Sequence, residues 1–225
     1  MHIDIYSDTI CPWCYIGKRR LGRALAARPQ DGLTLRWRAF QLNPDMPAGG
    51  MERQHYLELK FGGPANARTI YDRVREAGQE EAIPFAFEAI RRTPNTIGSH
   101  RLIRYATQQD NGPLDAGQGN AADAVVDALF EAYFLRGEDI GDLDVLCDAA
   151  AIGGLDPMDA RVFLESEAGL EAVRAEDAQA RHIGIQGVPT FILDGKYVLS
   201  GAHPPEVLFQ FFDLAKHGES AEADG

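Results

Sequence analysis

The chain has 225 residues, of which 22 are lysine or arginine and 34 are aspartate or glutamate, so its formal net charge is −12. This balance disfavours a nucleic-acid partner, because phosphate backbones are normally met by a basic surface. Hydrophobic residues make up 45% of the chain, which suits one large domain or a small fold with a substantial insertion. No apolar run reaches the roughly 20 residues of a membrane helix, and residues 1–5 lack signal-peptide features. We therefore expect a cytoplasmic protein without a membrane partner.

The first part of the chain predicts a strand, a helix and a second strand. Residues 3–7 form the first strand, Pro12 to Ala27 the helix, and the alternating apolar positions of residues 33–38 the second strand. Strands joined in this way lie parallel, through a right-handed crossover.

The middle of the chain, from about Met51 to Ile183, has an almost wholly helical pattern. The clearest amphipathic segment is residues 122–134, and the glycine-rich residues 111–120 predict a loop. The expected N-caps of helices in this part are Asn95 or Thr96, Asp142 and Asp156.

After Gly184 the two-residue period of a strand returns. Residues 190–193 and 196–200 predict two strands joined by a turn at Asp194-Gly195, and Pro204 to Lys216 predicts a closing helix. We therefore expect an α/β protein with a thioredoxin fold interrupted by a large all-helical insertion. The expected division is a discontinuous thioredoxin-like domain at 1–43 and 184–217, a helical insertion domain at 44–183, and a frayed tail at 218–225.

A Cys11-Pro12-Trp13-Cys14 motif lies where the first strand gives way to the first helix. Helix geometry puts positions i and i+3 on one face, so the two sulfurs can close a small disulfide ring. Cys11 would lie at the helix N-terminus, where backbone N–H groups favour a thiolate, and Cys14 would be more buried. This predicts a redox pair with Cys11 as nucleophile and Cys14 as resolving thiol. Zinc is disfavoured, because structural zinc takes four ligands and Cys147 is the only other cysteine.

Together with Gly187-Val188-Pro189-Thr190, this motif resembles the DsbA-like branch of the thioredoxin superfamily, and more narrowly its cytoplasmic FrnE-like members. Supporting segments span nearly the whole chain, at residues 8–17, 40–44, 94–96, 100–102 and 187–191. The resemblance implies a thiol–disulfide oxidoreductase whose substrate is a disulfide-containing protein or a small thiol. It implies no bound cofactor, and glutathione or another thiol reductant is the candidate co-substrate.

The resemblance also assigns the residues around the two sulfurs. It implies a cis Val188–Pro189 bond beside the cysteines, with Pro12, Trp13 and Thr190 shaping the site. In thioredoxin and DsbA, an acidic residue about six positions before the first cysteine helps to move protons to the buried thiol. This chain has Ile5 at that position, so the candidates for this role are Asp8 and water. Pro12 and Trp13 add no cation, and we therefore expect a less oxidising disulfide than that of DsbA.

Asn95 and His100 lie in a segment that the family shares and are candidates for substrate binding from the insertion. The alternatives are a helix cap for Asn95 and a hydrogen-bonded surface position for His100. Cys147 is expected to fill the core, because a free cysteine among apolar neighbours is usually buried.

Two other functions remain open at this point. The same architecture resembles glutathione-dependent enzymes, namely 2-hydroxychromene-2-carboxylate isomerase and kappa-class glutathione transferase, which typically present a serine near the position of Cys11. The third hypothesis is a redox-sensing binding or chaperone-like module. The sequence leaves the oligomeric state and the particular substrate undetermined.

Overall fold

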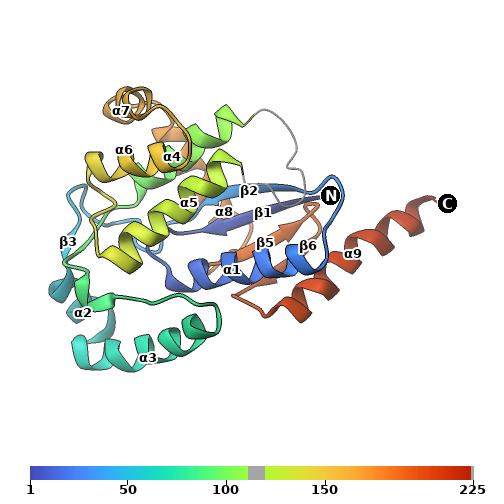
Figure 1. Ribbon diagram of the computed structural model, residues 1–225, viewed down its shortest axis with the longest axis horizontal. Coiled ribbons are helices and arrows are strands. Elements are labelled where there is room, and N and C mark those ends of the chain that lie inside the picture. Colours follow the sequence, from blue (N-terminus) through green and yellow to red (C-terminus); the bar gives the residue numbers. More distant parts are fainter. Residues whose placement is uncertain (111–119, 224–225) are drawn as a thin grey trace.

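A computed structural model of the protein describes residues 1–110 and 120–223, with side chains up to residue 214. Residues 111–119 of the predicted loop and the end of the predicted tail, residues 224–225, lie outside this description. A four-stranded sheet in the order β2-β1-β5-β6 forms the centre of the molecule (Figure 1). Its strands are β1 (His2–Ser7), β2 (Thr34–Ala39), β5 (Thr190–Leu193) and β6 (Tyr197–Ser200).

The sheet joins the two ends of the chain. Strand β1 runs parallel to β2 and antiparallel to β5, and Ile5 lies level with Trp37 on one side and with Phe191 on the other. Helix α1 (Pro12–Ala27) has the predicted bounds. Helix α9 (Pro205–Ala223) packs against α1, β5 and β6, and it continues beyond residue 216, where the sequence prediction ended it. This is the predicted thioredoxin fold, with residues far apart in sequence completing one sheet.

The insertion between β2 and β5 is mainly helical, as predicted. It also contains a two-stranded sheet that the pattern did not indicate, because strands of two residues are too short to show a period. The α-helices and strands of the insertion are β3 (Met51–Glu52), α2 (Arg53–Phe61), α3 (Pro64–Glu80), β4 (Arg92–Thr93), α4 (Ile97–Gln109), α5 (Ala121–Glu131), α6 (Leu143–Ile152), α7 (Pro157–Glu165) and α8 (Leu170–His182).

Local sequence explains where two of these helices begin. The Asp142 side chain accepts hydrogen bonds from the backbone at the start of α6, and Asp156 does the same for α7, which opens with Pro157. Both are the expected N-caps, since a short acidic side chain satisfies free N–H groups at a helix start.

In Figure 1, α2 and α3 lie at the lower left and α6 and α7 at the upper left, whereas α9 extends to the right.

The insertion shares its hydrophobic core with the thioredoxin-like part. Tyr15 of α1 stacks on Phe130 of α5 with ring centroids 5.0 Å apart, and it also packs against Phe85 and Phe134. All four side chains are buried in one cluster that also contains Ile5. These aromatic residues of the insertion thus serve packing, and α1 contacts both the insertion and α9. In the part of the chain that the structure describes, no helix is long and apolar enough to cross a membrane.

The aromatic contact between α1 and α5 predicts a large effect on stability. Replacing Phe130 by alanine should lower the free energy of unfolding by about 3–5 kcal/mol, because a fully buried ring is removed and a cavity remains. The matched control is Met158→Ala at an exposed position of α7, which should change it by less than about 0.5 kcal/mol. Urea titrations of the three proteins measure both values, and similar losses in the two variants would contradict the shared core.

Candidate active site

The two cysteines lie at the start of α1, directly after the end of β1. Cys11 is the N-cap residue, with extended backbone, and Pro12 and Trp13 begin the helix. The Cys11 N–H donates to the Asp8 carbonyl at 3.0 Å, and the Cys14 N–H donates to the Cys11 carbonyl at 3.0 Å. Proline is suited to this first turn because its missing N–H would have had no helical partner. The motif therefore folds as the sequence predicted, with both sulfurs at one end of the sheet.

Cys14 is the more buried of the two sulfurs, with 1% of its surface exposed against 4% for Cys11. Burial raises the pKa of the Cys14 thiol well above its ordinary value, and the neighbouring Cys11 sulfur raises it further. The Ser7 hydroxyl and the Asp8 backbone N–H, both hydrogen-bonded to Cys14, act in the opposite direction and lower this pKa. Both cysteines are free thiols here. The Cys14 thiol therefore holds its proton tightly.

The second segment of the site is the loop before β5. The Val188–Pro189 peptide bond is cis, and the Cys11 thiol donates to the Val188 carbonyl at 3.5 Å. The Thr190 hydroxyl donates to the Gly187 carbonyl at 2.8 Å, which folds this loop on itself. The structure therefore brings residues 187–190 against Cys11, from the other end of the chain.

The close approach of this loop to α1 depends on Gly17, one turn beyond Cys14. A Cβ atom at Gly17 would lie 2.9 Å from Cγ of Pro189, which is closer than carbon atoms normally pack. Gly17 had no assigned role in the sequence analysis. Its requirement becomes visible only once the proline loop is in place.

Trp13 is the exposed member of the motif, with 37% of its side chain accessible. An indole at the surface beside two buried sulfurs offers a flat apolar contact. Pro12 is partly buried beside it.

His100 is buried, so the alternative of a surface histidine is wrong. Its Nε2 lies 3.6 Å from Oδ1 of Asp8, a carboxylate that is fully buried three residues before Cys11. The hydroxyl oxygens of Thr9 and Ser99 are 2.7 Å apart and join this turn to α4. The helix that follows the shared segment thus packs directly behind the cysteine turn.

Asn95 caps α4 through its side chain, although Thr96 is the residue at the cap position. Its Oδ1 accepts from the Ile97 N–H at 3.0 Å, and its Nδ2 donates to the Met46 carbonyl at 2.7 Å. The alternative of a helix cap is therefore confirmed, and the same amide anchors the segment after β2. Substrate contact by Asn95 stays a prediction.

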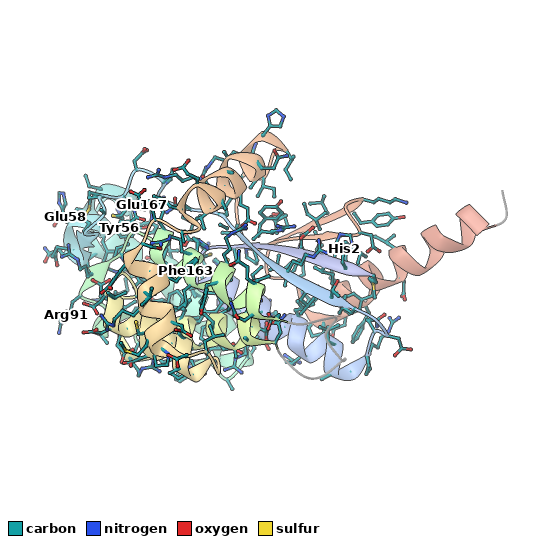
Figure 2. All side chains as sticks on the ribbon, turned by 90° about the horizontal axis from the view of Figure 1, so that it is seen from above. His2, Tyr56, Glu58, Arg91, Phe163 and Glu167 are labelled. Atoms are coloured by element: carbon teal, nitrogen blue, oxygen red, sulfur yellow. The ribbon has the colours of Figure 1, made fainter. Side chains whose placement is uncertain are left out.

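Tyr56 of α2 is a neighbour of the site that the sequence analysis missed. Burial raises the pKa of its phenol, and the nearby charges of Asp8 and Cys11 raise it further, whereas a hydrogen bond from Asn43 and the charge of Arg53 lower it. Figure 2 shows Tyr56 towards the left, well away from His2, where β1 begins. The only sequence signal was its place on a short helix after the shared segment at residues 40–44.

The site therefore consists of two thiols at a helix N-terminus, a cis-proline loop and a buried acidic residue, on a thioredoxin fold. Among the residues described, no three histidine, cysteine, aspartate or glutamate side chains gather in a way that could hold a metal ion. Cys147 lies away on α6, where it is buried as expected and burial raises the pKa of its thiol. These features define the class of thioredoxin-fold dithiol proteins.

Comparison with known families makes the class more specific. The family described as the DSBA-like thioredoxin domain matches residues 2–213, and the chain belongs to this family. A probable DsbA oxidoreductase from Streptomyces coelicolor, known from its crystal structure, is 30% identical in sequence with a TM-score of 0.82. The match covers 96% of this chain and 90% of that one.

Two more distant structures share the fold. A 2-hydroxychromene-2-carboxylate isomerase is 21% identical with a TM-score of 0.66, and the match covers 100% of this chain and 98% of that one. The cytosolic disulfide reductase DsbM of Pseudomonas aeruginosa, solved with GSH, is 18% identical with a TM-score of 0.61. That match covers 89% of this chain and 90% of the other.

The contact between Gly17 and Pro189 yields a prediction with a control on the same helix. Gly17→Ala should lower the free energy of unfolding by about 1–3 kcal/mol, because the new methyl group forces the proline loop away. Gly22→Ala should instead raise it by about 0.5–1 kcal/mol, since nothing lies within 4 Å of its added Cβ and alanine favours helix. Urea unfolding measures both changes, and stabilisation by both substitutions would show that the loop does not need Gly17.

Proposed function

We propose that the protein is a thiol–disulfide oxidoreductase that uses Cys11 as the nucleophile and Cys14 as the resolving thiol. The observation that carries this proposal is the asymmetry of the two sulfurs. Cys11 caps the helix and faces the Val188 carbonyl, whereas Cys14 is buried behind it with its proton tightly held. Membership of the DSBA-like family and the Streptomyces coelicolor relative support the same chemistry.

The reaction proceeds in two exchanges. The Cys11 thiolate attacks one sulfur of a substrate disulfide, and the other substrate sulfur leaves with the electron pair. Cys14 then loses its proton and attacks Sγ of Cys11, which forms the Cys11–Cys14 disulfide and releases the second substrate thiolate. The substrate is reduced by two electrons and the protein is oxidised by two. The reverse sequence oxidises a substrate dithiol.

The surroundings of Cys11 suit a substrate that arrives in an extended conformation. The Val188 backbone beside the sulfur offers polar groups to pair with, and Trp13 offers an apolar surface. The substrate is accordingly a protein disulfide or a small thiol. Glutathione is the candidate reductant that regenerates the dithiol, and the similar fold of the DsbM reductase solved with GSH supports this choice.

We place the activity in the cytoplasm, where glutathione maintains a reducing poise. The direction of exchange depends on the potential of the Cys11–Cys14 pair relative to that poise. We expect a less oxidising pair than that of DsbA, because Pro12 and Trp13 supply no positive charge to hold a thiolate.

A glutathione-dependent isomerase is the second candidate, because the isomerase structure aligns with the whole chain. Two cysteines within one turn argue against it, since a disulfide would compete with simple activation of bound glutathione. A redox-sensing binding module would change its partner affinity on oxidation without turnover.

Single substitutions at the two cysteines distinguish their roles. Cys11→Ser should abolish disulfide exchange, because the attacking sulfur is lost. Cys14→Ser should accumulate a mixed disulfide on Cys11, because nothing resolves it. Mass spectrometry after incubation with oxidised glutathione, without reductant, detects the adduct. Cys147→Ala, which changes a buried cysteine of α6, is the matched control and should keep full turnover. Normal turnover by either active-site variant would disprove the scheme.

Equilibration with glutathione tests the redox pair itself. Across ratios of reduced to oxidised glutathione, Cys11 and Cys14 should change together as one two-electron couple, with a potential below the ≈ −120 mV of DsbA. Alkylation at each ratio followed by mass spectrometry measures the fraction of closed disulfide. A pair that never closes, while glutathione binds without a covalent bond, would favour the isomerase.

A further inference from the structure

Strand β2 lies at one edge of the central sheet, with β1 as its neighbour in the order β2-β1-β5-β6. At its start, the Thr34 N–H donates to the Met1 carbonyl of the β1 side at 3.1 Å. Just beyond its end, the Phe40 N–H donates to the Ser7 carbonyl at 3.1 Å. Peptide groups of successive residues in a strand point in opposite directions, so the odd-numbered residues between these two, Trp37 among them, direct their N–H groups away from the sheet.

A cavity of about 270 Å³ lies along this free edge. Its lining comes mainly from β2, α4 and α8, and both helices contact β2 and each other. Three arginines are part of the lining, namely Arg36 and Arg38 of β2 and Arg104 of α4. The cavity is thus rich in positive charge, although the formal net charge of the chain is −12.

One carboxylate of the chain already binds at this edge. Oε2 of Glu176 in α8 accepts from the outward N–H of Ala39 at 3.2 Å. Oε1 of the same carboxylate lies 3.0 Å from Nη1 of Arg38 and 3.5 Å from Nη1 of Arg104. A backbone N–H and arginine side chains therefore hold a carboxylate together, and such charge-assisted hydrogen bonds suit the planar guanidinium group.

The same kinds of donor occur a second time along the strand. The outward N–H of Trp37 lies two residues before that of Ala39, which is a spacing of about 6.6 Å in a strand. Arg36 is exposed and lines the cavity beside it. Among the residues that the structure describes, neither the Trp37 N–H nor the Arg36 side chain has a partner. This second set of donors is ready for a carboxylate that the chain itself does not supply.

The charges around the cavity leave a positive excess. Arg38 pairs with Asp4 as well as with Glu176, and Oδ1 of Asp4 lies 2.8 Å from Nε of the arginine. The three guanidinium groups of the cavity therefore share two carboxylates. Arginine keeps its charge throughout the physiological pH range, so the excess persists. One added carboxylate would balance the charges.

We propose that this cavity binds a small organic carboxylate, which accepts from the Trp37 N–H and pairs with Arg36. A dicarboxylate suits it best, because Arg104 contacts Glu176 at only 3.5 Å and is available to a second carboxylate. The volume lies just below the roughly 300–1,000 Å³ of sites for drug-sized ligands, which also favours a small molecule. The inference goes beyond the proposed function, since neither cysteine of the motif lines the cavity.

Calorimetric titration of the full chain with succinate tests the site, and succinamide, the neutral diamide of the same length, is the ligand control. Succinate should bind at one site with a Kd of about 1 mM or tighter, and succinamide should not bind. Added sodium chloride should weaken the binding of succinate, because the contacts are ionic. Equal heats for the two compounds would overturn the proposal.

Substitution of Arg36 tests the assigned contact. Arg36→Gln should weaken succinate binding about tenfold or more, since a hydrogen bond between charged groups is lost. Arg36→Lys keeps the charge without the planar fork and should weaken it by less. The matched control is Arg91→Gln, which changes an exposed arginine outside the cavity and should leave the affinity unchanged. Equal affinities of Arg36→Gln and the parent protein would disprove the contact.

Substitution of Glu176 should have the opposite effect. Glu176→Gln removes the negative charge beside the site and should tighten succinate binding about threefold or more. Glu171→Gln, at an exposed position of the same helix, is the matched control and should leave it unchanged. If the arginines serve only the ion pairs within the chain, none of these proteins binds succinate, and the proposal fails.

Backbone amide signals of isotope-labelled protein report where succinate binds. The largest shifts should occur at Trp37 and its neighbours in β2, and hydrogen exchange of the Trp37 N–H should slow. Largest shifts elsewhere would overturn the site, and tighter binding of inorganic phosphate than of succinate would overturn the choice of a carboxylate. Cys11→Ser should bind succinate as the parent does, so a failure of the proposed oxidoreductase function is distinguished from a failure of this site.

Discussion

The position of Cys14 under the first turn of α1 is the constraint on which the site depends. Helix geometry keeps its sulfur near that of Cys11, while the core of the protein keeps it from water. The same burial makes ionisation of the Cys14 thiol, the proposed resolving thiol, unfavourable. In the proposed reaction, the surrounding structure keeps the Cys11 thiol near the surface and the Cys14 thiol buried behind it.

Residues of the insertion help to position α1 and the turn that carries the two cysteines. Phe130 holds α1 from the side, and α4 packs His100 and Ser99 behind the cysteine turn. The segment after β2 is fixed in turn, because Asp177 of α8 accepts from the Gln41 N–H at 2.7 Å. Residues from all three parts of the chain therefore set the environment of two sulfurs. A sheet of four short strands alone would leave Cys14 less shielded.

Much of the fold and half of the site followed from local patterns. The bounds of α1, the caps at Asp142 and Asp156, and the hairpin at Asp194 follow from short-range chemistry that acts in any context. The two-residue strands β3 and β4 were missed because such a segment has no measurable period. The surface position considered for His100 was wrong, because one polar residue on an amphipathic helix does not reveal what that helix packs against.

The sequence by itself determined the chemistry of the site and the order of the fold. A Cys-Pro-Trp-Cys motif at a strand-to-helix junction specifies two sulfurs on one helical face, whatever surrounds them. Only the tertiary structure decided which groups meet those sulfurs. The contacts of Gly17 with Pro189, of Asp8 with His100, and of Ser7 with Cys14 join residues that lie apart in the sequence. Such contacts arise from packing of elements, which the spacing of residues along the chain does not encode.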